Sequence, residues 1–315
     1  MALPINKIIC GDCLEVLRTF PDDCVDCCVS SPPYWGLRNY GVSGQLGLEK
    51  TPEEYVAKMV EVFREVRRVL KPTGTLWLNL GDSYGSGNRK TQKAQTVANG
   101  NRQDLPEERG KQGYAKQLVG IPWRVAFALQ ADGWWLRQDI IWAKPNPMPE
   151  SVTDRCTKAH EYVFLMSKSQ HYYFDNEAIK EDSVDEESYT GRRFRTADRR
   201  RTGLVEQHID QSCSKIYEKR NKRSVWSVNV SCNIGSERKE HFATFPEKLI
   251  EPMIKAGCPQ NGVCFDPFMG AGTVGLVAKK LGVNYVGIEL NPKYIKMADA
   301  RIGSVEENLF KKKVV

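Results

Sequence analysis

The segment "DPFMGAGTVG" near the C-terminus contains residue types that could bind a nucleoside. Gly270, Gly272 and Gly275 form a G-x-G-x-x-G pattern between a predicted strand and a predicted helix, and Glu289 ends the next predicted strand. Glycines let the backbone approach a ligand closely, and a carboxylate at that position can accept hydrogen bonds from ribose hydroxyls. The pattern therefore predicts a cofactor that contains adenosine. A glycine-rich turn without a ligand is the alternative for the three glycines alone.

Two features favour S-adenosylmethionine over a dinucleotide such as NAD. Only residues 290–315 follow Glu289, which is too short for the second half of a dinucleotide-binding fold. Asp266 and Pro267 precede the glycines, and a carboxylate suits an ammonium group better than a pyrophosphate, which prefers backbone N–H groups at a helix N-terminus. S-adenosylmethionine has a ribose and an amino group but no phosphate.

The second segment with chemical potential is "SPPY" at residues 31–34, which follows the apolar run "CVDCCV". Two successive prolines end the predicted strand, because proline lacks the N–H group that a sheet ladder needs. In a parallel sheet, strand ends meet at the carboxyl edge, where ligands bind. The predicted strands that end near Asp12, Ser31, Asp82 and Asp266 would all bring their following residues to that edge.

Hydrophobic periodicity predicts the elements that position these segments. Apolar residues recur at helical spacing over residues 52–70, with Thr51 as the N-cap and Pro52 at the first helical position. The segment "KPTG" is expected to end this helix, and "TLWLNL" is expected to be the next strand. Strand, long helix and strand in succession predict an α/β fold with a parallel sheet. Residues 175–240 show weak periodicity and are interpreted as an insertion.

Charge and composition bound the class of protein. The 315 residues are 41% hydrophobic and 27% charged, as in ordinary soluble globular proteins. No apolar run approaches the ~20 residues of a membrane span, and the N-terminus lacks a signal-peptide pattern, so we expect a cytoplasmic protein and no membrane contact. Residues 191–223 hold eleven Lys or Arg against four Asp or Glu, which favours a polyanionic partner. A solvated loop is the alternative.

The cysteine spacing resembles a metal site. Cys10 and Cys13, and again Cys24 and Cys27, are spaced like zinc-knuckle pairs among ten cysteines. Most of these residues lie in apolar runs, however, where cysteine behaves as a small hydrophobic residue. We therefore expect reduced cysteines and no metal site.

Together and in this order, the motifs resemble the S-adenosylmethionine-dependent DNA amino-methyltransferases of the permuted β arrangement. In that family an (S/N/D)-P-P-(Y/F/W) motif precedes the recognition region and an F-x-G-x-G motif comes last. The resemblance covers nearly the whole chain: "GDCLEVL" and "SPPYWGL" near the start, "IIWAKPNPMPESVTDRCTKAHEYVFLMSK" in the middle, and "HFATFPEKLIEPMI", "DPFMGAGTVG" and "GIELNPKY" near the end.

The resemblance implies a Rossmann-like methyltransferase fold with a circularly permuted motif order. The expected sheet is mostly parallel and twisted, with helices on both faces. Residues 1–174 would form the catalytic part, with a mobile loop at about 84–116. Residues 175–240 would form the inserted DNA-recognition region, and residues 241–315 the cofactor-binding part of the same methyltransferase domain.

The chemistry implied by the resemblance is transfer of a methyl group to the exocyclic amino nitrogen of a flipped base. That nitrogen is a poor nucleophile because its lone pair is delocalised into the ring, so it needs acceptors for its N–H bonds. The Ser31 hydroxyl and the Pro32 carbonyl would act as these acceptors, and Tyr34 would stack on the extruded base. No covalent nucleophile and no metal are needed. The implied catalytic residues are Ser31, Pro32, Pro33 and Tyr34.

The resemblance also implies the binding residues. Those for the cofactor are Asp12, Asp266, Pro267, Phe268, Gly270, Gly272, Thr273, Glu289 and Asn291. Those for nucleic acid are Arg38, Arg192, Arg193, Arg195, Arg199, Arg200, Arg201, Lys219, Arg220, Lys222 and Arg223. Asp12 equally fits a helix N-cap, and these two roles are compatible. His160 and Glu161 are interpreted as a structural pair.

Serine at residue 31 favours cytosine N4 as the target, since family members with Asp at this position mostly act on adenine N6; adenine N6 stays open. Three alternatives are an RNA or protein methyltransferase, a nucleic-acid-binding module without activity, and a dehydrogenase if NAD binds. The expected partner is double-stranded DNA in a bacterial or phage setting. A separate cognate restriction endonuclease is compatible with this, and so are a monomer and a homodimer.

Overall fold

The computed structural model describes residues 3–37, 39–85, 114, 116–183, 219–230 and 245–305. The chain divides into two compact units. One comprises Met1–Asp175 with Ser224–Val315, and the other is Asn176–Arg223.

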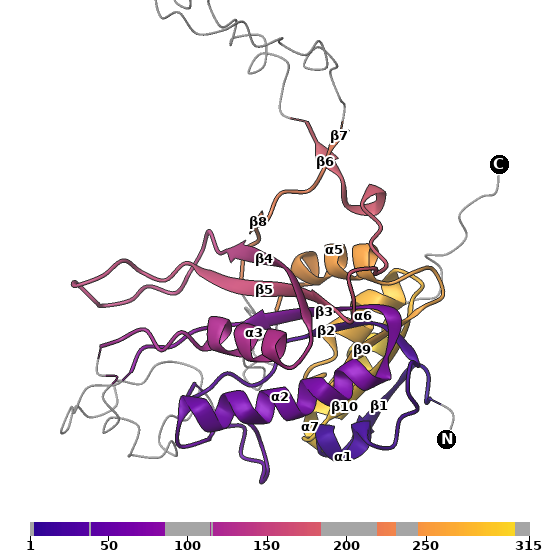
Figure 1. Ribbon diagram of the computed structural model, residues 1–315, viewed down its shortest axis with the longest axis horizontal. Helices are drawn as coiled ribbons and strands as arrows, with labels where there is room; N and C mark the ends of the chain where they lie inside the picture. Colours follow the sequence, from indigo (N-terminus) through magenta and orange to yellow (C-terminus); the bar gives the residue numbers. More distant parts are fainter. Residues whose placement is uncertain are drawn as a thin grey trace, which may run out of the picture. The chain divides into compact units, whose positions relative to one another are not determined.

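The larger unit is built on an eight-stranded sheet with the strand order β1-β10-β9-β2-β3-β5-β4-β8 (Figure 1). The strands are β1 (Lys7–Cys10), β2 (Val25–Ser30), β3 (Leu70–Leu80), β4 (Trp135–Ala143), β5 (His160–Ser167), β8 (Val225–Ser227), β9 (Val263–Asp266) and β10 (Asn284–Glu289). Neighbouring strands run parallel except at β5, which is antiparallel to both β3 and β4. The predicted mostly parallel sheet is confirmed.

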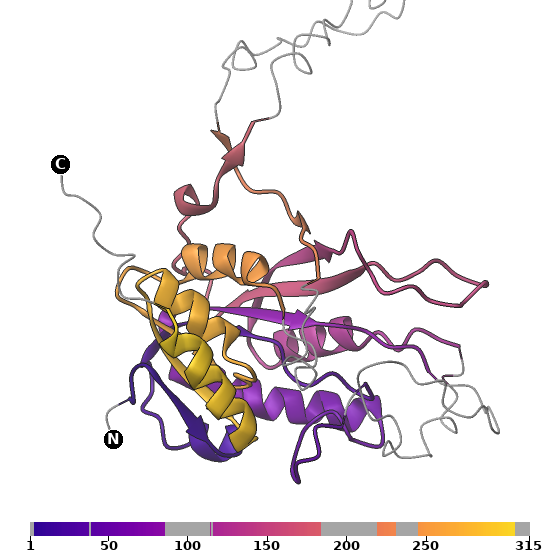
Figure 2. The same ribbon diagram turned by 180° about the vertical axis from the view of Figure 1, so that it is seen from behind.

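Helices cover both faces of this sheet, as predicted (Figures 1 and 2). One group is α1 (Cys13–Leu17), α2 (Pro52–Val69) and α3 (Ile121–Ala131), and the other is α5 (Glu247–Gly257), α6 (Thr273–Lys280) and α7 (Pro292–Gly303). In α2 the apolar positions at helical spacing are buried against the sheet, including Tyr55, Phe63 and Val66. The Thr51 hydroxyl accepts a hydrogen bond from the Glu54 N–H at 3.1 Å, which confirms the predicted N-cap.

Two local features differ from the sequence-based expectations. The segment "KPTG" lies inside β3 rather than between elements, because the backbone is already extended at Leu70, which pairs with Val25. Strand β8 had no periodic signal, since three residues are too few to show one. It nevertheless extends the sheet, with Val225 opposite Ile141.

In the smaller unit the structure describes a 3-10 helix, η3 (Glu177–Ile179), and a ladder of β6 (Glu181–Asp182) with β7 (Lys219–Arg220). The Glu181 carboxylate accepts from Arg220 at 3.1 Å and from Arg223 at 2.6 Å. This unit falls within the region predicted to recognise DNA, and the recognition role stays a prediction.

The cysteines of β2 are part of the hydrophobic core. Cys27 and Cys28 are fully buried, which confirms their interpretation as small hydrophobic residues. Across the described ranges, no group of three or more His, Cys, Asp or Glu side chains is placed to hold a metal ion. Within the same ranges, no helix combines the length and apolar character needed to cross a membrane.

Candidate active site

Strand pairing brings the two motifs together. Strand β9, which leads into the glycine segment, lies directly beside β2, which leads into residues 31–34, with Cys28 opposite Phe265. At the end of these strands the Ser30 hydroxyl donates to the Asp266 carboxylate at 2.7 Å, although the two residues are 236 positions apart in the sequence. The carboxyl edge of the sheet therefore holds both motifs, as predicted.

A cavity of about 990 Å³, part of it open to solvent, lies between the motifs. The predicted site residues that line it are Asp12, Ser31, Pro33, Pro267, Phe268, Gly270, Thr273, Glu289 and Asn291. The predicted residues Pro32, Tyr34, Asp266 and Gly272 are not among the residues that line it. The site is thus continuous from the glycine segment to Ser31.

Glu289 ties the glycine segment to the end of β10. One of its carboxylate oxygens accepts from the Gly270 N–H at 2.8 Å, and the other accepts from the Asn291 N–H at 2.7 Å. Burial raises the pKa of this carboxyl above its ordinary value, although these N–H donors oppose the shift. A carboxylate has further acceptor sites, so Glu289 can also accept from hydroxyl groups in the cavity.

Gly272 meets a conformational and a packing requirement at the start of α6. Its φ is +76°, a backbone region that favours glycine. A Cβ atom there would lie 2.6 Å from the Cβ of Ala298 on α7. The loop between β9 and α6 therefore approaches α7 as closely as a glycine allows.

Two lining residues are also helix N-caps. One carboxylate oxygen of Asp12 accepts from the N–H groups of Leu14 and Glu15 at the start of α1, which confirms the N-cap alternative. The Asn291 side chain accepts from the Lys293 N–H at the start of α7. Both side chains are held in place by these bonds while they line the cavity. Their roles toward a cofactor stay predictions.

Asp266 is almost completely buried, with 1% of its surface exposed. Burial raises the pKa of its carboxyl to about 7, and the nearby Glu289 adds to this, while bonds from Ser30 and the Phe268 N–H oppose it. The Asp266 side chain is not part of the cavity lining, and its bond from the Phe268 N–H stabilises the loop between β9 and α6. Direct contact between Asp266 and an ammonium group stays a prediction.

The loop of residues 31–34 is held by partly buried hydrogen bonds. The Tyr55 hydroxyl donates to the Pro33 carbonyl at 2.9 Å. The Tyr34 ring packs against Gly81, where a Cβ atom would come within 2.4 Å of it. Burial, together with the nearby Glu161, raises the pKa of the Tyr34 hydroxyl well above its ordinary value. Tyr34 therefore stays protonated and can act as a donor.

A polar cluster that the sequence analysis did not assign lies beside this loop. The Tyr34 hydroxyl donates to Glu161 at 2.7 Å, and Glu161 also pairs with Lys144. Nearby, Lys158 lies 3.9 Å from the Asp82 carboxylate. The sequence showed Glu161 only as part of a His-Glu pair at a strand start, and no local signal linked it to a motif 127 positions earlier.

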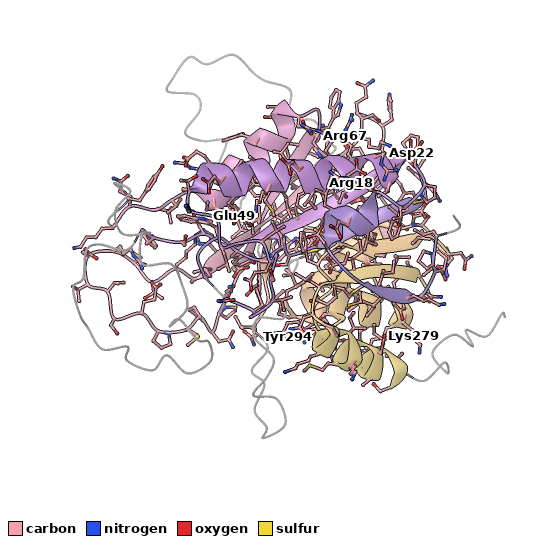
Figure 3. The ribbon with its side chains drawn as sticks, turned by 90° about the horizontal axis from the view of Figure 1, so that it is seen from below. Arg18, Asp22, Glu49, Arg67, Lys279 and Tyr294 are labelled. Atoms are coloured by element: carbon pink, nitrogen blue, oxygen red, sulfur yellow. The ribbon has the colours of Figure 1, made fainter. Side chains whose placement is uncertain are left out.

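A further part of the cavity lining was also missed. It comprises residues 40–46 and Tyr294, whose ring meets the Tyr40 ring edge-on at 6.4 Å. Figure 3 shows Tyr294, on α7, at the same end of the sheet as Glu49, whereas Arg67 and Lys279 lie toward the opposite end. The only local signal for residues 40–46 was their position directly after the motif loop.

Most of the predicted nucleic-acid-binding residues lie outside the described ranges: Arg38, Arg192, Arg193, Arg195, Arg199, Arg200 and Arg201. The others, Lys219, Arg220, Lys222 and Arg223, belong to the smaller unit. Their contact with DNA stays a prediction.

The lining of the cavity fits S-adenosylmethionine better than a dinucleotide. Among its described lining residues there is no Lys or Arg, whereas Asp12 and Glu289 are both acidic. An acidic lining suits a cofactor with a sulfonium and an ammonium group, and it disfavours a pyrophosphate. Tyr40, Phe268 and Tyr294 add aromatic surface on which an adenine can pack.

Comparisons with known proteins show the family to which the chain belongs. The family model for DNA methylases of the N6 and N4 type matches residues 25–300. A Type II methyltransferase from Citrobacter freundii, M.Cfr9I, is 43% identical over 307 residues, which cover 96% of this chain and 89% of that protein.

Solved structures show the same fold. The cytosine-N4-specific PvuII DNA methyltransferase superposes with a TM-score of 0.64 at 19% identity, covering 96% of this chain and 86% of that one. The complex of M1.HpyAVI with S-adenosylmethionine has a TM-score of 0.53 at 17% identity, with coverages of 94% and 98%. The chain therefore belongs to the N6 and N4 DNA methylases, enzymes that transfer a methyl group from S-adenosylmethionine to an exocyclic amino group of a DNA base.

Proposed function

We propose that the protein methylates the N4 amino group of cytosine at a specific sequence in double-stranded DNA, with residues 31–34 as its catalytic motif. The observation that carries this proposal is that Ser31 and Pro33 line the same cavity as Gly270 and Glu289. A base amino group that reaches Ser31 would therefore be next to a cofactor held by the glycine segment.

The motif would activate the amino group by accepting its N–H bonds. S-adenosylmethionine, when bound, supplies an electrophilic methyl group on a sulfonium sulfur. The Ser31 hydroxyl oxygen and the Pro32 carbonyl would accept from the amino group, so that its lone pair turns out of the ring and toward the methyl group. The Pro33 carbonyl is already bound by Tyr55 at 2.9 Å, which holds the loop in one conformation. The Tyr34 ring would offer a surface to the extruded base.

The choice of cytosine rests on residue 31. The Ser31 hydroxyl is neutral, whereas many family members that act on adenine N6 have a carboxylate at the corresponding position. Adenine N6 is the second candidate, because the exocyclic amino groups of the two bases need the same kind of acceptors. Either base would be methylated in the same cavity, so the two candidates are distinguished by identifying the methylated base.

The basic residues of the chain support duplex DNA as the partner. Residues 191–223 hold eleven Lys or Arg against four Asp or Glu, and such a block would neutralise backbone phosphates. The bacterial relative named above is a Type II methyltransferase, which supports a cytoplasmic role beside a separate cognate restriction endonuclease.

The proposal is tested by expression in a host without DNA methylation, followed by sequencing of its DNA with detection of modified bases. We expect N4-methylcytosine at one short recurrent sequence, and no modification with Ser31→Ala or Tyr34→Ala. Calorimetry should show that both variants still bind S-adenosylmethionine. N6-methyladenine as the product would overturn the choice of base, and normal methylation by both variants would overturn the catalytic assignment.

A further inference from the structure

A continuous chain of hydrogen bonds runs from the cavity into the protein. The Ser31 hydroxyl donates to the Tyr34 hydroxyl oxygen at 3.3 Å, and the Tyr34 hydroxyl donates to Glu161 at 2.7 Å. Ser31 lines the cavity, whereas Glu161 is on β5, with only 15% of its side chain exposed. The chain thus links the proposed acceptor of the base amino group to a carboxylate behind it.

The direction of these bonds is set by the two groups that surround the Tyr34 hydroxyl. The Asn79 amide nitrogen donates to the Tyr162 carbonyl at 3.0 Å and to Glu161 at 3.2 Å, so its oxygen faces Tyr34 at 3.0 Å as an acceptor. An ionised carboxylate is also only an acceptor. The single proton of the Tyr34 hydroxyl is therefore directed inward, and the oxygen lone pairs remain for Ser31.

Lys144 holds Glu161 from the other side. It follows the end of β4, and its ammonium group pairs with the second carboxylate oxygen of Glu161. The two side chains are only 17% and 15% exposed, so the pair is shielded from water. Both oxygens of Glu161 are thereby used as acceptors, one for Lys144 and one for Tyr34 and Asn79.

We propose that Glu161 is a positioning residue for methyl transfer, which orients the hydrogen-bond chain so that Ser31 faces the base amino group as an acceptor. Because Tyr34 donates to Glu161, the Ser31 proton is directed toward Tyr34, and the Ser31 lone pairs face the cavity. A Ser31 hydroxyl with the opposite orientation would present its proton to the amino group and would repel its N–H bonds. This inference rests on the proposed role of residues 31–34.

The test is a double-mutant cycle with Glu161→Gln and Tyr34→Phe. Glutamine has the same shape but can present an N–H donor to Tyr34, and phenylalanine removes the hydroxyl through which Glu161 acts. We expect each single variant to lower kcat by roughly 10- to 100-fold, with KM for DNA and the Kd of S-adenosylmethionine within about twofold of wild type. The double variant should lose little more than either single variant.

The control is Glu251→Gln, which makes the same substitution in an exposed Glu–Lys pair on α5, with Lys255 at 2.6 Å, among residues that do not line the cavity. It should leave kcat unchanged. Wild-type activity of Glu161→Gln, or losses that multiply in the double variant, would overturn the inference while the proposed function stands. If Glu161→Gln does not fold, wild-type kcat in Tyr34→Phe alone would overturn it. Wild-type protein that transfers no methyl group to DNA would overturn the proposed function and this inference with it.

Discussion

Replacing Gly272 with alanine should destabilise the cofactor loop in two ways, by backbone strain and by a steric clash. Gly120 provides a matched control for the backbone strain. Both residues are helix N-caps in the left-handed backbone region, Gly272 before α6 at φ +76° and Gly120 before α3 at φ +78°. A Cβ atom on Gly120 would meet nothing within 4 Å, whereas one on Gly272 would lie 2.6 Å from Cβ and 3.0 Å from Cα of Ala298. The two variants thus share the backbone strain and differ in the steric clash.

The expected losses of stability follow from the backbone strain and the steric clash. The left-handed conformation costs a non-glycine residue about 1–2 kcal/mol, and this is the whole expected loss for Gly120→Ala. At Gly272 the clash involves the backbone of α7, which cannot rotate away as a side chain could. Such overpacking adds about 1–3 kcal/mol, so Gly272→Ala should lose about 2–5 kcal/mol of stability. It should also weaken S-adenosylmethionine binding, because Gly270 and Thr273 on either side line the cavity.

Urea unfolding of both variants, with calorimetric titration of S-adenosylmethionine, measures these quantities. The difference between the two losses of stability isolates the contact between the loop and α7. Equal destabilisation of the two variants, or unchanged cofactor affinity in Gly272→Ala, would refute the reasoning.

Three further predictions follow from the site and the charge pattern. Tyr55→Phe leaves the Pro33 carbonyl without the hydroxyl that donates to it at 2.9 Å. Urea unfolding should therefore show a free energy of unfolding lower by about 1–3 kcal/mol, and methylation assays should show a lower kcat. A variant as stable and as active as wild type would contradict this prediction. Burial is the main reason that the pKa of Asp266 is raised from 3.8 to about 7. The native state therefore binds this proton more tightly than the unfolded state does, and the free energy of unfolding falls by up to about 4 kcal/mol as the pH rises from about 4 through 7. Asp266→Asn should flatten that part of the stability profile, and an unchanged profile would show that another group titrates. Replacing Arg199, Arg200 and Arg201 with alanine should reduce the slope of log K against log salt for DNA binding by up to about 3, with cofactor binding unchanged; an unchanged slope would place the DNA contact elsewhere.

The sequence predicted the elements whose signals are local. Helix α2 was found with its N-cap and buried face, because about five turns of apolar spacing and the Thr51-Pro52 start all lie within one segment. The glycine segment also has a local signal, because Gly272 adopts a positive φ at the turn into α6 and glycine favours this conformation. Strand β8 was missed because three residues carry no period, and the start of β3 was misplaced because "KPTG" is typical of a turn.

The cavity could be anticipated only in part. The residues that precede and follow the strand ends, such as Asp12, Ser31 and Glu289, were expected at one edge because parallel strands end there. Residues 40–46 and Tyr294 join the lining through side-chain packing, which leaves no periodic or motif signal.

By itself, the sequence determined the two chemical motifs, their permuted order and the cofactor class, since these depend on residue types at fixed local spacing. The tertiary structure decided which groups meet. Strand β9 pairs with β2, so segments more than 200 positions apart share one cavity. Strand β5 runs antiparallel to β3, which brings Glu161 at its start to the Tyr34 hydroxyl, and the end of β4 brings Lys144 to Glu161. Hydrogen bonds between side chains depend on positions to within a few tenths of an ångström, and only the packing of strands from distant parts of the chain sets those positions.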